Sequence, residues 1–222
     1  MSIREERKQQ SRQAIIEAAL LLCASGRSFS NISLREITRA VGLVPTAFYR
    51  HFDNMDALGL EIVDQVSLYF KSLVRHLGKI YLYLPEEKLE QSLELFLRSV
   101  EQSSNPWIFL ITERWGGSHI LRDAISRELR FIIEDLAHDL QKFQEIQHIQ
   151  KQELIVLSKI LLNLSFNWAM TWISYQQQFS GEKLKQQQQL FKQQTFTQIK
   201  LLFKGIAHWD CEKIPPFLAQ KQ

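Results

Sequence analysis

The chain is poor in the residues that build turns and cross-links. Among its 222 residues are eight Gly, five Pro and two Cys. Cys23 and Cys211 are far apart and in no metal-binding or redox spacing, which is typical of a protein in a reducing cytoplasm. Cys23 falls among apolar positions and is expected in the core. No hairpin dipeptide stands between alternating apolar and polar runs. These absences predict an all-α protein without a disulfide framework.

The sequence also lacks the patterns of membrane proteins and of common enzymes. Its most apolar run, residues 160–173, is shorter than the ~20 residues of a membrane span, and its N-terminus is too polar for a signal peptide. It has no Gly-x-Ser-x-Gly, phosphate-binding Gly loop or His-Glu-x-x-His. Glu134, Asp135 and His138 share a spacing that a metal could use, but a solvated helix face explains them more simply. We expect a cytoplasmic protein that is not an enzyme, with no cofactor, no metal and no membrane partner.

Positive charge is concentrated in the first quarter of the chain. Residues 1–52 contain eight Lys or Arg and four Glu, whereas the net charge of the whole chain is only +3. A basic end on a near-neutral remainder suits the binding of an anionic polymer. The first eight residues are either a basic arm that reaches DNA or a frayed terminus.

Residues 33–52 predict two short helices joined by a tight turn. Ser33 and Glu36 have the spacing of a capping box, and Gly42 follows the first helix where a left-handed residue is favoured. Pro45 stands at the first position of a second helix, from 45 to about 51. Two short helices with Gly in the turn are typical of a helix-turn-helix, whose second helix enters the major groove of DNA.

The same stretch supplies the candidate DNA contacts. Arg35 can reach a guanine or a phosphate, and Ala47 is small enough to contact a thymine methyl. Tyr49 and His51 are expected to bind phosphates, whereas Thr46 and Arg50 can serve either role. The full predicted DNA-binding set is Ser33, Arg35, Pro45, Thr46, Ala47, Tyr49, Arg50 and His51.

These residues resemble a known family. "SRQAIIEAALLLCASG" followed by "SLREITRAVGLVPTAFYRHFDNMDALG" resembles the DNA-binding domain of TetR-type transcriptional regulators. "NPWIFLITERWGGSHILRDAISRELRFIIEDLAHDL" and "FKGIAHW" resemble one branch, the repressors of unsaturated fatty-acid synthesis (FabR/DesT type). Many family members have Lys at the start of the fourth helix to hold a phosphate. Here Met55 stands in that place, so a charged contact is lost.

The remainder of the chain predicts a second, larger helical domain. We expect an N-terminal three-helix helix-turn-helix domain over residues 1–54 and a C-terminal ligand-binding and dimerisation domain over residues 55–222. The expected helices span about 9–24, 55–83, 107–115, 118–143, 151–178 and 186–209. Phe196, Ile199, Phe203 and Ile206 follow the spacing of a seam for another helix.

The last two expected helices carry more apolar surface than a thin domain can hide, which favours a homodimer. Internal core packing is the alternative, although the resemblance also implies a dimer. A dimer would present two recognition helices to a palindromic double-stranded operator.

Excess aromatic residues in the second domain could line a tunnel for an apolar ligand. Core packing is the simpler explanation for any one of them. The resemblance implies a long-chain acyl thioester, either acyl-CoA or acyl-carrier protein, as effector of a repressor of lipid genes. A drug or another small hydrophobic molecule is the alternative. The predicted ligand-binding residues are Phe109, Arg114, Trp115, Phe166, Trp168 and Met170.

Overall fold

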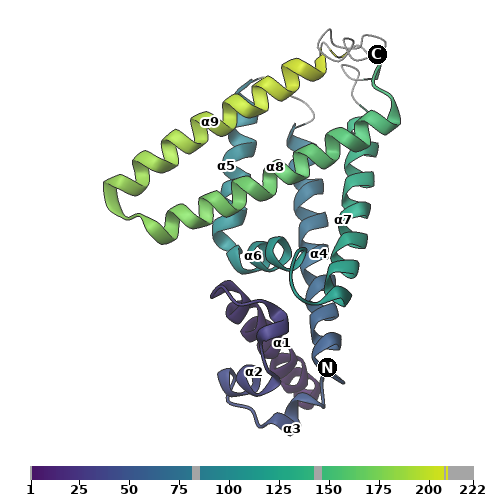
Figure 1. The fold of residues 1–222 in the computed structure, drawn as a ribbon, viewed down its shortest axis with the longest axis vertical. Helices are drawn as coiled ribbons and strands as arrows, with labels where there is room; N and C mark the ends of the chain where they lie inside the picture. The colour runs from purple at the N-terminus through teal and green to yellow at the C-terminus, as the bar shows by residue number, and fades with distance from the viewer. Residues whose placement is uncertain (1, 82–85, 143–146, 208, 210–222) are drawn as a thin grey trace, which may run out of the picture. The chain divides into compact units, whose positions relative to one another are not determined.

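The computed structural model describes residues 2–81, 86–142, 147–207 and 209, which contain helices and no strand (Figure 1). The all-α prediction is therefore confirmed. The helices are α1 (Ile3–Ala24), η1 (Phe29–Asn31, a 3-10 helix), α2 (Leu34–Ala40), α3 (Pro45–Phe48), α4 (Met55–Tyr81), α5 (Glu86–Gln102), α6 (Ser104–Glu113), α7 (His119–Leu140), α8 (Lys151–Gln178) and α9 (Gly181–Ala207).

Contacts divide the chain into two compact units. The first unit is Met1–His76 with Phe96–Ile132, and the second is Leu77–Leu95 with Ile133–Gln222. The first unit therefore contains α1, α2 and α3 together with most of α4, α6 and most of α7. The predicted first domain is only a part of this unit.

The core of the first unit forms where the inward faces of its helices meet. Ile15 and Ile16 of α1, Ile37 of α2 and Phe48 of α3 are fully buried. Cys23 is buried with them, as the sequence predicted. On α4, Leu58, Ile62, Val66 and Phe70 recur at helical spacing and are all buried.

Several helix boundaries differ from the prediction, and each difference has a local cause. α1 begins at Ile3 because Ser2 and Glu5 form a capping box, so the expected arm or frayed terminus is helical from residue 3. α6 begins at Ser104, before Pro106, and α9 begins directly after Ser180 at Gly181, where φ is +59°. The ends predicted at 83 and 143, and Cys211, lie outside the described residues.

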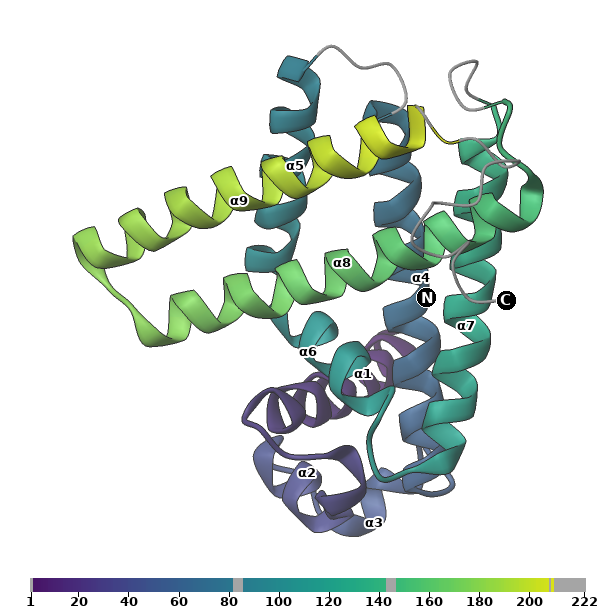
Figure 2. The same cartoon turned by 45° about the horizontal axis from the view of Figure 1, so that its top comes forward.

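The second unit is built on the α8–α9 pair, which runs as an antiparallel hairpin in both views (Figures 1 and 2). Its core cluster is Ala137, Leu140, Ile149, Leu154, Leu157 and Ile206. The Trp168 indole N–H of α8 donates to the Gln198 side chain of α9 at 2.8 Å. Ile199 and Ile206 are buried, so the predicted seam of α9 packs within the chain. Other apolar residues of the pair remain outside.

α8 is one of the two helices predicted to carry more apolar surface than the domain can hide, and its Val156 and Ile160 are exposed in the single chain. Among the described residues, α8 is also the helix whose length and composition would suit a membrane span. Core helices of soluble proteins share both properties, and Leu154, Trp168 and Trp172 are buried against this chain. The helix is therefore weak evidence for a membrane.

Candidate nucleic-acid interface

Helix α2 is fixed at its start by the predicted capping box. The Glu36 backbone N–H donates to Ser33 Oγ at 3.3 Å, and the Ser33 backbone N–H donates to Glu36 Oε2 at 2.9 Å. The Ser33 hydroxyl also donates to Glu36 Oε2, at 2.8 Å. Both Ser33 donors are therefore engaged within the chain, so a bound phosphate would compete with Glu36 for them.

Arg27 holds the Glu36 carboxylate from the other side. Its Nη1 lies 2.7 Å from Glu36 Oε1, and its Nη2 donates to the Asn31 carbonyl at 2.7 Å. The Arg27 guanidinium, and then the Ser33 donors, lower the pKa of Glu36 to about 2. Glu36 is therefore ionised near neutral pH, the form that accepts the hydrogen bonds at the start of α2.

The turn and the second helix also follow the predicted pattern. Gly42 has φ of +69°, a conformation that L side chains rarely adopt, and Pro45 is the first residue of α3. α3 ends at Phe48, earlier than predicted, and the chain continues in hydrogen-bonded turns: the Arg50 and His51 N–H groups donate to Ala47 and Phe48 carbonyls.

The outer face of this helix-turn-helix is formed by most of the predicted DNA-binding residues. Ser33, Arg35, Pro45, Thr46, Tyr49 and Arg50 are exposed, and Ala47 and His51 are partly buried. The Tyr49 side chain is 62% exposed, with its ring packed edge-on against buried Phe48 at 5.7 Å between centroids. A cavity of about 340 Å³ between α2 and α3 is lined by Arg35, Glu36, Thr38, Arg39, Leu43 and Pro45.

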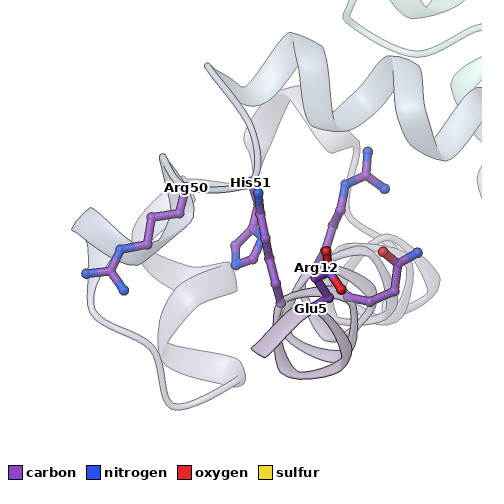
Figure 3. Close-up of a pocket in the computed structure, with 6 residues that line it drawn as sticks. Glu5, Arg12, Arg50 and His51 are labelled. Carbon is purple, nitrogen blue, oxygen red and sulfur yellow. The ribbon is translucent and has the colours of Figure 1, made fainter. Parts of the chain in front are cut away.

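A second cavity, of about 410 Å³, lies where α1 meets the turn after α3 (Figure 3). Its lining residues are Glu5, Lys8, Gln9, Arg12, Arg50 and His51. In Figure 3 the Arg50 side chain extends away from α1 into open space. The lining thus combines Lys8 and Arg12 with the acidic Glu5, and positively charged side chains at such a place suit a backbone phosphate.

His51 is held inside this cavity and does not point freely outward. Its Nε2 lies 3.0 Å from Ser11 Oγ of α1, and its Nδ1 is buried without a hydrogen-bond partner among the described residues. Burial, and then the positive charges of Lys8, Arg12 and Arg50, lower the pKa of His51. The imidazole is therefore neutral at pH 7 and joins α1 to the end of the helix-turn-helix.

Arg12 is a site residue that sequence reasoning missed. Its guanidinium pairs with Glu61 of α4 at 2.8 Å and lies 4.8 Å above the centre of the Phe52 ring. The Glu61 side chain, acting first as hydrogen-bond acceptor, raises the pKa of Arg12. Lys8 and Arg12 are four residues apart, so they share one helix face. That spacing could have revealed the basic face once residues 3–8 were recognised as helical.

The predicted ligand-binding residues do not form a described cavity. Phe109 is fully buried and packs edge-on against Phe29 at 6.3 Å between ring centroids. Trp115 is 79% exposed, and the Arg114 guanidinium lies 5.2 Å from the centre of its ring. These three residues belong to the first unit. Phe166, Trp168 and Met170 belong to the second unit, where the first two are buried and Met170 is partly exposed.

Comparison with known families matches both halves of the chain. Residues 15–62 match the model of bacterial regulatory proteins of the tetR family, and residues 85–195 match that of a tetracyclin repressor-like C-terminal domain. A helix-turn-helix-type transcriptional regulator of Haemophilus influenzae is 33% identical over 159 residues, which cover 70% of this chain and 77% of the relative.

Solved structures share the fold at low identity. FadR from Bacillus subtilis, solved in complex with stearoyl-CoA, has a TM-score of 0.59 at 13% identity, over 88% of this chain and 97% of its own. NalD, the secondary repressor of the MexAB-OprM multidrug efflux pump in Pseudomonas aeruginosa, has a TM-score of 0.54 at 22% identity, over 89% of this chain and 96% of its own.

Proposed function

This chain belongs to the TetR family of bacterial transcriptional regulators, and we propose that it is a cytoplasmic, homodimeric repressor of genes of lipid metabolism. Residues 1–54 contact the operator, and residues 55–222 bind the effector and the second subunit. The effector is a long-chain acyl thioester, presented as acyl-CoA or as acyl-carrier protein.

The observation that carries the DNA-binding proposal is the exposed outer face of the helix-turn-helix. Arg35, Thr46, Tyr49 and Arg50 extend from a backbone fixed by the capping box, by Gly42 and by Pro45. Fixed backbone geometry is needed because base-edge hydrogen bonds are specific only when donors and acceptors are placed within narrow limits.

DNA selection tests this proposal directly. The purified protein is used to select duplexes from a random library, and the enriched sequence is then bound by Arg35→Ala and Tyr49→Ala variants. Each should lose at least about tenfold in affinity, the cost of one good base or phosphate contact. Arg130→Ala, an exposed arginine of α7, is the matched control. Enrichment of no sequence, or unchanged binding by Arg35→Ala and Tyr49→Ala, would contradict the assignment.

The homodimer is supported by apolar side chains that the α8–α9 pair leaves outside. Val156 and Ile160 of α8 are four residues apart, and Leu190 and Leu201 of α9 are eleven apart, so each pair lies on one helix face. All four are exposed, Leu201 by 66%. A second copy of the same surface would cover them with apolar atoms, giving a four-helix arrangement across a two-fold axis.

The lipid effector is supported by two observations. The sequence resembles the fatty-acid repressor branch over residues 105–140 and 203–209, and the FadR structure that shares this fold was solved with stearoyl-CoA. The alternative is a drug or another small hydrophobic molecule, and NalD, a repressor of a multidrug efflux pump with the same fold, favours it.

Melting and operator binding separate the two effector classes. Stearoyl-CoA and oleoyl-CoA are compared with free CoA, free fatty acid and a panel of drugs, since a ligand of the folded state raises Tm by mass action. An acyl-CoA effect absent with free CoA supports the lipid effector. A response to drugs alone favours the alternative. If acyl-CoA acts only weakly, the same measurements with acyl-carrier proteins test whether the acyl chain is presented by that carrier.

A further inference from the structure

A buried carboxylate at the end of α6 caps a helix of the DNA-binding part. Glu113 is the last residue of α6 and its side chain is 1% exposed. Glu113 Oε1 accepts the Phe29 backbone N–H at 2.9 Å, and Oε2 accepts the Ser28 hydroxyl at 3.4 Å. Phe29 is the first residue of η1, and its N-cap, Ser28, makes no side-chain capping hydrogen bond. Glu113 therefore supplies an acceptor that the start of η1 lacks within its own sequence.

Two glycines allow close packing around this contact. A Cβ on Gly116 would overlap the Glu113 carboxylate. A Cβ on Gly59 of α4 would lie 2.9 Å from the Phe29 ring and 2.8 Å from Leu121 of α7. Close-packed contacts of this kind exchange between discrete arrangements and deform little.

From η1 the contacts continue to the first turn of α2. The Asn31 carbonyl, at the end of η1, accepts from Arg27 Nη2, and Arg27 Nη1 pairs with Glu36. Glu36 in turn accepts both Ser33 donors. A contiguous series of hydrogen bonds and one short backbone segment thus joins the end of α6 to the helix that carries Ser33 and Arg35.

We propose that Glu113 is a positioning residue for DNA binding: it ties α6 to η1 and, through Arg27, fixes the start of α2, so that a shift of α6 changes how Ser33 and Arg35 meet the operator. This rests on the proposed function, because it gives the effector's signal a route through η1 and α2. Among the described contacts, the Glu113 carboxyl group is bonded to Phe29 and Ser28 and to no basic side chain.

Amide exchange in the full-length protein tests the tie without DNA or effector. In Glu113→Ala, amides of residues 28–36 should exchange at least about tenfold faster, because their local opening no longer breaks the Glu113 contacts. Glu113→Gln retains an acceptor for the Phe29 N–H and should restore most of the protection. Amides of α8 should not change. Glu134→Ala, which removes an exposed glutamate of α7, is the matched control.

Operator affinity gives the functional readout, with the duplex selected by the wild-type protein as probe. Glu113→Ala should bind it about fivefold or more weakly, in the range reported for mutations along coupling networks, and Glu113→Gln less so. Gly116→Ala should weaken operator binding to a similar degree, because its methyl group displaces the Glu113 carboxyl group. Gly116→Ala should weaken binding less in the Glu113→Ala background than in the wild type, since the displaced carboxyl group is then absent and only the 3.1 Å approach to the Glu113 Cα remains.

Three results would overturn the proposal: unchanged exchange in residues 28–36 of Glu113→Ala, exchange that rises uniformly through the chain in step with a lower Tm, or unchanged operator affinity. The effector is tested apart from these. If stearoyl-CoA changes the operator affinity of the wild-type protein, the ratio of the affinities with and without stearoyl-CoA should lie closer to one in Glu113→Ala. If it does not change wild-type affinity, the lipid effector fails, while the exchange and affinity measurements still decide the role of Glu113.

Discussion

The helix-turn-helix surface and the α8–α9 pair are built in opposite ways. The first is a set of polar side chains on short helices, each fixed by a local signal such as the Ser33–Glu36 box or the φ of Gly42. The second is two long helices that leave apolar residues such as Ile160 and Leu201 outside. Local signals fix one surface in a single chain, whereas the other is completed only by a partner in the dimer that we propose.

The largest effect is expected from breaking the second surface while the first stays intact. Ile160→Glu and Leu201→Glu place charges where apolar contact is proposed, so sedimentation should show monomers. Operator affinity should fall by about 100-fold or more, because the second half-site no longer gains from tethering. Gln177→Glu, an exposed change at the end of α8, is the control. A charged variant that remains dimeric would contradict the assigned face.

The converse change breaks the first surface and spares the second. Gly42→Ala forces an L side chain into positive φ, which costs about 1–2 kcal/mol, although the site itself has open space around it. Chemical denaturation should show this loss of stability, and operator binding should weaken while the sedimentation coefficient stays that of the wild type. Gly205→Ala, in open space on α9 without positive φ, should be neutral or stabilising.

A gain of function sharpens the assignment of the DNA-facing edge. Met55 is the first residue of α4, where many relatives carry Lys by the resemblance noted above. Met55→Lys should raise operator affinity several-fold and steepen the salt dependence by about 0.9 per added phosphate contact. Met55→Gln, of similar size but uncharged, controls for shape. An unchanged slope would mean that α4 begins away from the DNA backbone.

The smallest effect concerns pH. Because burial lowers the pKa of His51, the unfolded chain takes up a proton near the ordinary histidine pKa of about 6.5 when the folded protein does not. The free energy of unfolding should therefore fall as pH drops below that value and level off below the folded pKa. His51→Gln should remove this part of the slope in urea titrations at a series of pH values. His148→Gln, at an exposed position, should retain it.

The sequence predicted the features that depend on neighbours along the chain. The capping box of Ser33 and Glu36, the positive φ of Gly42 and the place of Pro45 at the start of α3 all follow the prediction. The capping box of Ser2 and Glu5 has the same spacing as that of Ser33 and Glu36, so the sequence also allowed a prediction of the helical start of α1, where we expected either a basic arm or a frayed terminus.

What the sequence could not give depends on residues far apart. Glu113 follows an apolar stretch of α6 and has no pattern that predicts burial, because its partners, Ser28 and Phe29, are more than eighty positions away. The contact of Ser11 with His51 likewise requires α1 to lie against the turn after α3. Such pairings arise from tertiary packing, which helical periodicity does not specify. The DNA and ligand residues themselves remain predictions.

Cys23 gives the protein a built-in chemical reporter. Burial, and then the nearby Glu113 charge, raise the pKa of its thiol to about 12, so almost no thiolate, the reactive form, exists at neutral pH. Alkylating agents and oxidants can then attack Cys23 only in molecules whose first unit has opened. Its modification rate counts those openings, and while that unit is closed the thiol is silent to the redox state of the cell.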